Sequence, residues 1–158
     1  MKPLEIAGLR SYAVPVDVPS ISKQPIIFYD GVCALCNWCV TFTLKHDKAG
    51  RFHFAALQSE VAKKLLQPYE ISPQDLNTVV LLCEGRVYLK SDAVLKVLAY
   101  LGWPWSLCGV AKILPRFVRD FFYDCVAKFR YRMFGKLDVC PLPSADTRSR
   151  FVDFSQAP

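Results

Sequence analysis

Two cysteines, Cys33 and Cys36, stand where a short apolar strand turns into a helix, and this unit constrains the fold more than any other feature. The run 26–29 is β-branched and aromatic, which predicts a buried strand, and a turn signal follows at 30–31. From 33 to 48 apolar residues recur at helical spacing. A strand that continues through a helix into another strand normally pairs with it in parallel. The beginning of the chain therefore predicts an α/β protein.

The same alternation continues along the chain. We expect strands at 52–56, 78–83 and 86–90, and helices at 60–67 and 92–101 with Ser59 and Ser91 as N-caps. Gly50 is expected to end the first helix in the left-handed conformation, and Glu84-Gly85 to form a hairpin turn. A longer amphipathic helix is predicted from about 110 to 129, with a kink at Pro115.

This order of elements predicts a thioredoxin-like fold: a four-stranded mixed sheet flanked by helices, followed by a C-terminal helical extension. Residues 1–25 contain four prolines, which predict an extended N-terminal arm. The thioredoxin-like core is placed at 26–102, and a helical extension packed on it at 103–143. Residues 144–158 are predicted to be a polar tail.

Composition and charge narrow the function classes. The 158 residues are 53% hydrophobic and 22% charged, which argues against disorder, and a net charge of +6 is too mild to indicate nucleic-acid binding. Residues 1–25 show no secretory signal, and the longest apolar run, 97–111, is shorter than the roughly 20 residues of a spanning helix. Membrane association is not expected. Trp103 and Trp105 are predicted to pack against the domain, with a membrane-surface patch around them as the alternative.

Seven cysteines, an odd number, do not suit a disulfide-framed secreted domain. We therefore expect an intracellular, reducing compartment, the cytoplasm in the first place, with an organelle left open. In such a compartment clustered cysteines indicate redox or metal chemistry. The oligomeric state is left open.

The chemistry of the two cysteines follows from their place at a helix start. A thiolate is needed to attack a disulfide, and a helix N-terminus lowers a thiol pKa through its unpaired N–H groups. We expect Cys33 to be the nucleophile and Cys36, one turn later, to be the resolving thiol. Exchange then runs through a mixed disulfide. The expected partners are a protein or low-molecular-weight disulfide substrate and an unidentified electron donor, without a bound cofactor.

Asp30 and Gly31 precede the cysteines in the turn. Asp30 is a third candidate catalytic residue, because its carboxylate could accept a proton from the resolving thiol. The alternatives are that it caps the helix start or simply forms the turn before glycine. Gly31 is expected to adopt a positive φ in the turn.

The segment 30–37, with the sequence DGVCALCN, resembles the DCC family of thiol–disulfide oxidoreductases, which is named after this Asp and these two Cys. The resemblance covers about residues 25–143 and includes further strings: Ser91-Asp92-Ala93, Leu114-Pro115-Arg116, 130–135 (RYRMFG) and Cys140. It implies a thioredoxin-like fold and protein-disulfide oxidoreductase activity.

One feature departs from ordinary thioredoxins, which place a cis-proline immediately before the third strand. Asn77 and Thr78 occupy that place here, and Pro73 comes about five residues too early. Because cis-proline helps to dock extended substrates and keeps metals from the thiols, thioredoxin-like peptide binding is less expected. Thr78 is instead a candidate supporting residue.

Metal binding and a non-enzymatic role are the alternatives. The spacing of Cys33, Cys36 and Cys39 is that of the first three cysteine ligands of a ferredoxin iron–sulfur cluster. The position expected for the fourth ligand, however, holds Thr43. A zinc site would add two ligands to the CxxC pair, and none of the candidates forms a second close pair: Cys39, Cys83, Cys140, His46 and His53. A thioredoxin-like interaction module with an idle CxxC is the other alternative.

Three residues near the C-terminus are further supporting candidates. Cys140 could serve as a third redox thiol, form a mixed disulfide with a partner, or pack the extension onto the core. Arg130 and Arg132 belong to a basic helix side that is expected to be solvated, although they could pair with Asp30 or Asp92, or bind an acidic partner or an anionic membrane surface. The remaining cysteines are expected to fill the core: Cys83, Cys108 and Cys125.

Overall fold

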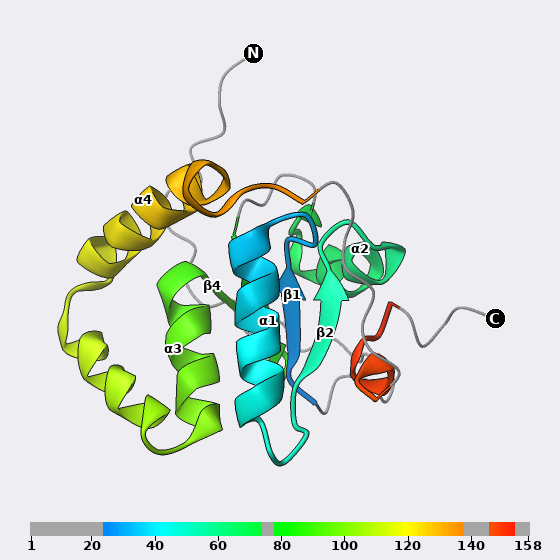
Figure 1. The fold of residues 1–158 in the computed structure, drawn as a ribbon, viewed down its shortest axis with the longest axis horizontal. Helices are drawn as coiled ribbons and strands as arrows, with labels where there is room; N and C mark the ends of the chain where they lie inside the picture. The colour runs from blue at the N-terminus through cyan, green and yellow to red at the C-terminus, as the bar shows by residue number, and fades with distance from the viewer. Residues whose placement is uncertain (1–23, 74–77, 138–145, 154–158) are drawn as a thin grey trace.

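The computed structural model describes residues 24–73, 78–137 and 146–153. Four strands form one sheet in the order β2-β1-β3-β4: β1 (Ile26–Tyr29), β2 (His53–Ala56), β3 (Val80–Cys83) and β4 (Arg86–Leu89). β1 pairs in parallel with β2 and antiparallel with β3, which pairs antiparallel with β4. The predicted thioredoxin-like α/β fold is confirmed, with its mixed sheet and flanking helices (Figure 1).

Both faces of the sheet are buried, because successive strand residues point to opposite sides. Ile26 and Phe28 face one core cluster, which includes Leu65 and Leu66 of helix α2 (Glu60–Leu66). Ile27 and Tyr29 face the other cluster, beneath helices α1 (Ala34–His46) and α3 (Lys90–Leu101). The strands of a sheet covered on both faces are expected to be continuously apolar, as observed for β1.

The helix ends differ from the prediction in detail. Ser59 caps α2, as predicted, because its Oγ accepts the Ala62 N–H at 3.2 Å. Ser91 does not cap α3: the helix begins one residue earlier, and the Ser91 hydroxyl donates to Asp120 at 2.5 Å. Gly50 is left-handed with φ 62°, but it lies in the loop beyond Asp47, the residue that caps α1.

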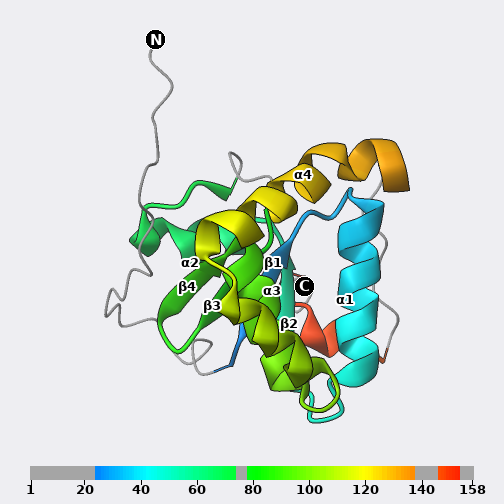
Figure 2. The same cartoon turned by 90° about the vertical axis from the view of Figure 1, so that its left-hand side faces the viewer.

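The chain after α3 forms two separate helical segments instead of one kinked helix. The first is a 3₁₀ helix, η4 (Trp105–Ile113), and the second is α4 (Arg116–Phe134). Pro115 stands at the N-cap of α4, where its missing N–H leaves no helical hydrogen bond unmade. Together η4 and α4 arch around the outside of α3 (Figures 1 and 2).

Helix α4 is attached through Arg119 and Arg130 of its basic side, so the pairing of Arg130 with Asp30 that the sequence left open is present. The other basic residues of this region are exposed, as expected: Lys112, Arg116, Lys128, Arg132 and Lys136. Arg119 pairs with Asp92 at 2.9 Å, and Arg130 is 3% exposed. By contrast, Phe117 is 76% exposed and Met133 is 70% exposed. The apolar stripe that predicted this helix therefore faces outward.

Two residues that the sequence predicted to be buried, Trp103 and Cys108, are exposed. Trp103 was expected to pack against the domain but is 82% exposed, whereas Trp105 is half-buried against the rings of Phe42 and His46. Cys108 is exposed on η4 instead of filling the core. Cys83 is buried, as expected, and Cys125 is half-buried.

The described C-terminal residues return to the sheet. The short 3₁₀ helix η5 (Arg148–Arg150) leads into Phe151 and Val152, which are buried in opposite core clusters. Arg150 pairs with Asp47 at 2.5 Å and donates to the Phe52 carbonyl at 2.6 Å. Residues 144–158 were predicted to be a polar tail, but Phe151 and Val152 of this segment pack in the core. No helix among the described residues is long and apolar enough to cross a bilayer.

Candidate functional site

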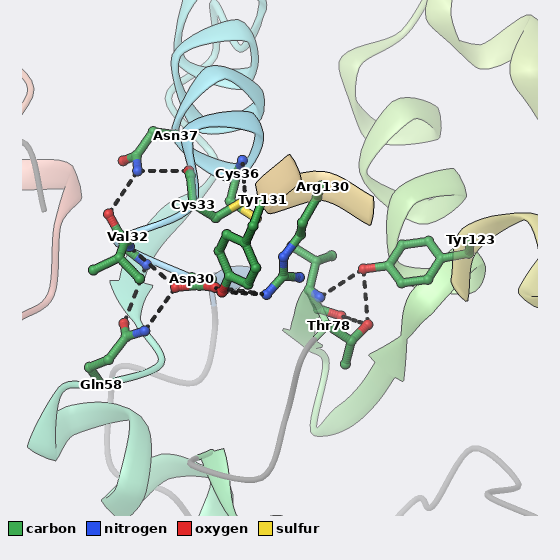
Figure 3. Close-up of polar contacts among 12 residues, drawn as sticks. Asp30, Val32, Cys33, Cys36, Asn37, Gln58, Thr78, Tyr123, Arg130 and Tyr131 are labelled. Carbon is green, nitrogen blue, oxygen red and sulfur yellow. Dashed lines mark hydrogen bonds and ion pairs between the residues drawn. The ribbon is translucent and has the colours of Figure 1, made fainter. Parts of the chain in front are cut away.

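Cys33 is placed by the turn between β1 and α1 and acts as the N-cap of that helix. Its Sγ accepts the N–H of Cys36 at 3.3 Å, so the sulfur lies at the positive end of the helix dipole (Figure 3). This is the arrangement that the spacing predicted. The side chain is also wholly buried, with 0% exposure, which the sequence did not predict.

Cys36 lies one turn further on and is half-buried. Burial raises the pKa of the Cys36 thiol, and the hydrogen bond and charge of Cys33 raise it further. The Cys36 thiol therefore holds its proton more strongly than an ordinary cysteine does.

A segment following α4 covers Cys33. Lys136 forms an antiparallel bridge with Cys33, the Ala34 N–H donates to the Gly135 carbonyl at 3.4 Å, and the Leu137 N–H donates to the Val32 carbonyl at 2.8 Å. Gly135 has a φ of 87°, a left-handed conformation that suits the glycine ending the helix. The extension thus closes over the candidate nucleophile.

Asp30 is 5% exposed and forms the centre of a polar network below the cysteines. One carboxylate oxygen accepts from Arg130 at 2.7 Å and from the hydroxyl of Tyr131. The other accepts from the Val32 N–H at 3.2 Å and from Gln58 Nε2 at 2.9 Å (Figure 3). Asp30 therefore does not cap α1, because Cys33 does so, and its charge is balanced by a buried arginine.

Asn37 and Gln58 hold the turn that carries Asp30. The Asn37 amide donates to the carbonyls of Gly31 at 2.8 Å and Cys33 at 3.0 Å. The Gly31 N–H donates to Gln58 Oε1 at 3.3 Å. Gly31 is not among the positive-φ glycines, so the expectation of a left-handed turn residue was wrong. Hydrogen bonds from side chains fix this turn instead.

Thr78 lies before β3, where thioredoxins place their proline, and bonds to Tyr123 of α4. The Thr78 hydroxyl and the Val79 N–H each donate to the Tyr123 hydroxyl at 2.9 Å (Figure 3). Burial raises the pKa of Tyr123, so the phenol remains neutral and can accept these bonds. The extension is thus tied to the core at the position of the missing cis-proline.

An apolar cavity of about 400 Å³ lies beside Cys36. Its walls come from the sheet, α1, α3, η4 and α4, and include Cys39, Phe42, Trp105 and Cys108. Cavities of this size are typical of small-molecule sites, and an apolar lining favours apolar groups. Substrate parts of that character could reach Cys36 from this side.

Three residues needed for this arrangement were missed in the sequence: Gln58, Tyr123 and Tyr131. Tyr131 follows Arg130 within the RYRMFG string, so that string was the available signal. Tyr123 lies on the polar side of α4, which was expected to be solvated. Gln58 carries no local signal, because it reaches Asp30 only through the folding of the chain after β2.

The other candidates are not brought into this network. Arg132 is exposed and forms no ion pair with the described residues, and Cys39 is exposed on α1. Cys140 lies outside the described residues. Within the described ranges, no group of three or more His, Cys, Asp and Glu side chains could hold a metal ion.

Comparisons with known proteins show which proteins this chain is similar to. Residues 27–136 match the family model described as DCC1-like thiol-disulfide oxidoreductase. A chloroplastic DCC family protein of Arabidopsis thaliana is 47% identical over 121 residues, covering 76% of this chain and 70% of that protein. The uncharacterized protein YuxK of Bacillus subtilis is 39% identical over 127 residues, covering 80% of this chain and 93% of that protein. No solved structure matches this chain.

Proposed function

We propose, on the premise that this chain belongs to the DCC1-like thiol-disulfide oxidoreductase family, that Cys33 and Cys36 exchange a dithiol for a disulfide with protein or small-thiol substrates. The observation that carries the proposal is the Cys33 Sγ at the N-cap of α1, accepting the Cys36 N–H. That place stabilises a thiolate, which is the attacking species in thiol–disulfide exchange.

The reaction proceeds in two balanced steps. The Cys33 thiolate attacks one sulfur of the substrate disulfide, forming a mixed disulfide and releasing the first substrate thiolate. Cys36 then loses its proton and attacks the Cys33 sulfur, closing the intramolecular disulfide and releasing the second substrate thiolate. The two substrate thiolates take up two protons. The dithiol gives up two electrons, and the reverse sequence would oxidise a substrate dithiol.

The electrostatics around the pair support this division of roles. The raised pKa of Cys36 keeps it as a thiol until the mixed disulfide has formed. The negative charge of Asp30 contributes to that raised pKa, whereas the positive charge of Arg130 opposes it. Asp30 is our candidate for receiving the Cys36 proton, and Arg130 holds its carboxylate in position at 2.7 Å.

The proposed reaction also requires that a substrate can reach Cys33, which is buried in this fold. Because Cys33 is wholly buried and residues 135–137 pair with the backbone at the start of α1, we expect a protein substrate to reach this thiol when the contacts of Gly135 and Leu137 open. These contacts are few and local, so they can open without unfolding the sheet.

The test is a redox titration of the full chain in a series of reduced and oxidised glutathione ratios. Alkylated thiols are counted by mass, and metal content is measured on the same sample. We expect a reversible two-electron transition that disappears in Cys33→Ser and in Cys36→Ser but remains in Cys125→Ser. The last variant is the matched control, because Cys125 lies on α4 outside both the network and the cavity beside Cys36.

Two results would overturn the proposal. A chain whose Cys33–Cys36 pair shows no transition at any ratio, with no metal bound, would be a thioredoxin-like interaction module. Stoichiometric zinc or iron that is lost in Cys33→Ser would assign the cysteines to a metal site.

A further inference from the structure

The outward side of η4 and α4, here called the outer apolar face, carries large apolar side chains that stay exposed among the described residues. Its members are exposed over both segments: Leu107, Val110, Ile113, Leu114, Phe117, Phe121, Phe122, Val126, Phe129 and Met133. Trp103 stands at its beginning. Figure 2 shows α4 lying across the surface of the molecule. Patches of this extent on soluble proteins mark interaction sites.

The core holds α4 in this orientation. On its inward side Lys90 pairs with Asp124 at 2.7 Å, Arg119 with Asp92 at 2.9 Å, and Arg130 with Asp30 at 2.7 Å. Rotating the helix to bury its phenylalanines would break these pairs and leave Asp30 as an unpaired buried charge, which is costly. The outer apolar face is therefore a fixed feature of the fold.

Positive charge accompanies this face. Between 103 and 137 the chain has seven Lys and Arg residues against two Asp, so this segment holds a net charge of +5 of the chain's +6. Four of the basic side chains are exposed and form no ion pair within the described residues: Lys112, Lys128, Arg132 and Lys136. The surface thus combines apolar area with uncompensated positive charge.

We propose that the outer apolar face docks this protein onto the surface of an anionic lipid bilayer. Helices that lie in a membrane interface have this composition: aromatic and aliphatic residues on one side, with Lys and Arg nearby that reach the lipid headgroups. Helix α4 lies in the plane of the interface and does not span the bilayer. In the sequence an anionic membrane surface was only an alternative for Arg130 and Arg132, because these aromatic residues were expected to be buried.

Charge decides against a second copy of the chain as the occupant. A twofold dimer places the same patch on both subunits face to face. Lys128 and Arg132 are exposed on α4, so such an interface would bring the positive charge of both copies together, which opposes association. Negatively charged headgroups instead pair with these side chains at every point of the surface.

Docking would also place the redox site near lipid. The cavity beside Cys36 is walled on its outer side by η4 and α4, through Trp105, Cys108 and Val126. When the outer apolar face contacts the bilayer, this cavity lies directly behind the helices in contact. Membrane binding and thiol exchange nevertheless remain separately measurable.

The test is sedimentation of the full chain with vesicles of phosphatidylcholine containing about 30% phosphatidylglycerol, compared with phosphatidylcholine alone. We expect binding to the anionic vesicles, weaker binding to the neutral ones, and partial release at high salt. Lys128→Gln should reduce partitioning about fivefold, because one basic residue near the surface is lost. Phe117→Ser combined with Phe121→Ser should abolish it.

Lys64→Gln is the matched control. Lys64 is an exposed lysine of α2, which covers the opposite face of the sheet (Figure 1), and its variant should bind like the original chain. The glutathione titration of each variant shows that it is folded. The proposal is overturned if the original chain stays in the supernatant with anionic vesicles, or if Lys64→Gln and Lys128→Gln lose equal binding. A dimer that buries Phe117 and Phe121 in solution would likewise overturn it.

Discussion

Replacing Arg130 with methionine tests whether the buried ion pair holds the extension and the site together. Arg130 and Asp30 are 3% and 5% exposed, and their N–O distance is 2.7 Å. With an effective dielectric constant of roughly 20, their Coulomb attraction at this distance is about 6 kcal/mol, part of which offsets the cost of removing both charges from water. The variant leaves the carboxylate buried without its cation. Such a loss costs about 3–5 kcal/mol.

This loss is a large fraction of the roughly 5–15 kcal/mol that stabilises an ordinary domain. We would measure it by urea unfolding under reducing conditions, followed by tryptophan fluorescence. Arg132→Met is the control, because Arg132 is exposed on the same helix, and it should change the free energy of unfolding by less than about 0.5 kcal/mol. Asp30→Asn should be similarly harmful to Arg130→Met.

The double variant tests whether the two single losses come from the same ion pair. Asp30→Asn with Arg130→Met leaves no buried charge, so it should be more stable than the sum of the two single losses predicts, by at least about 2 kcal/mol. If the two losses simply add, or if Arg130→Met unfolds within about 1 kcal/mol of Arg132→Met, the pair does not stabilise the fold in the way argued here.

Two further predictions concern the thiols and the tie between α4 and the sheet. In the reduced protein, iodoacetamide should label Cys36 more slowly than Cys108. The rate of labelling at Cys36 should still rise with pH above 9.0, the ordinary pKa of a cysteine, because burial and Cys33 raise the pKa of Cys36. Peptide mass mapping measures both rates, and a rate at Cys36 that becomes constant below pH 9.0 contradicts the prediction. Tyr123→Phe should lower stability by about 1–3 kcal/mol, because Val79 loses its hydrogen-bond acceptor. Tyr88→Phe, whose hydroxyl bonds to no described residue, should have little effect in the same urea measurement.

Local patterns were sufficient to predict the core of this protein. The apolar run of β1, the Asp-Gly turn and the helical spacing after Cys33 act over a few residues, and each has one low-energy outcome. The strand–helix alternation then allowed few topologies, because connections between parallel strands are right-handed. Cys33 at the helix N-terminus followed directly from these local rules.

The extension could not be predicted in the same way. An apolar stripe at helical spacing shows that a helix has two different sides, but it does not show which side meets the protein. Here the polar side of α4 faces the protein, because Asp30 is buried against Arg130 and Arg119 pairs with the half-buried Asp92. Leaving the buried carboxylate of Asp30 without its partner would cost more free energy than leaving a phenylalanine exposed.

The sequence by itself thus determined the strands, the helices of the core and the placement of the two thiols, which depend on neighbours a few residues apart. Tertiary structure decided which partner Asp30 takes: the sequence offered both Arg130 and Arg132, and Arg130, which lies 100 residues away along the chain, is the one that pairs with it. It also decided the cover over Cys33 and the outward direction of the outer apolar face. These features are set by charge burial and packing between distant segments, which no local pattern encodes.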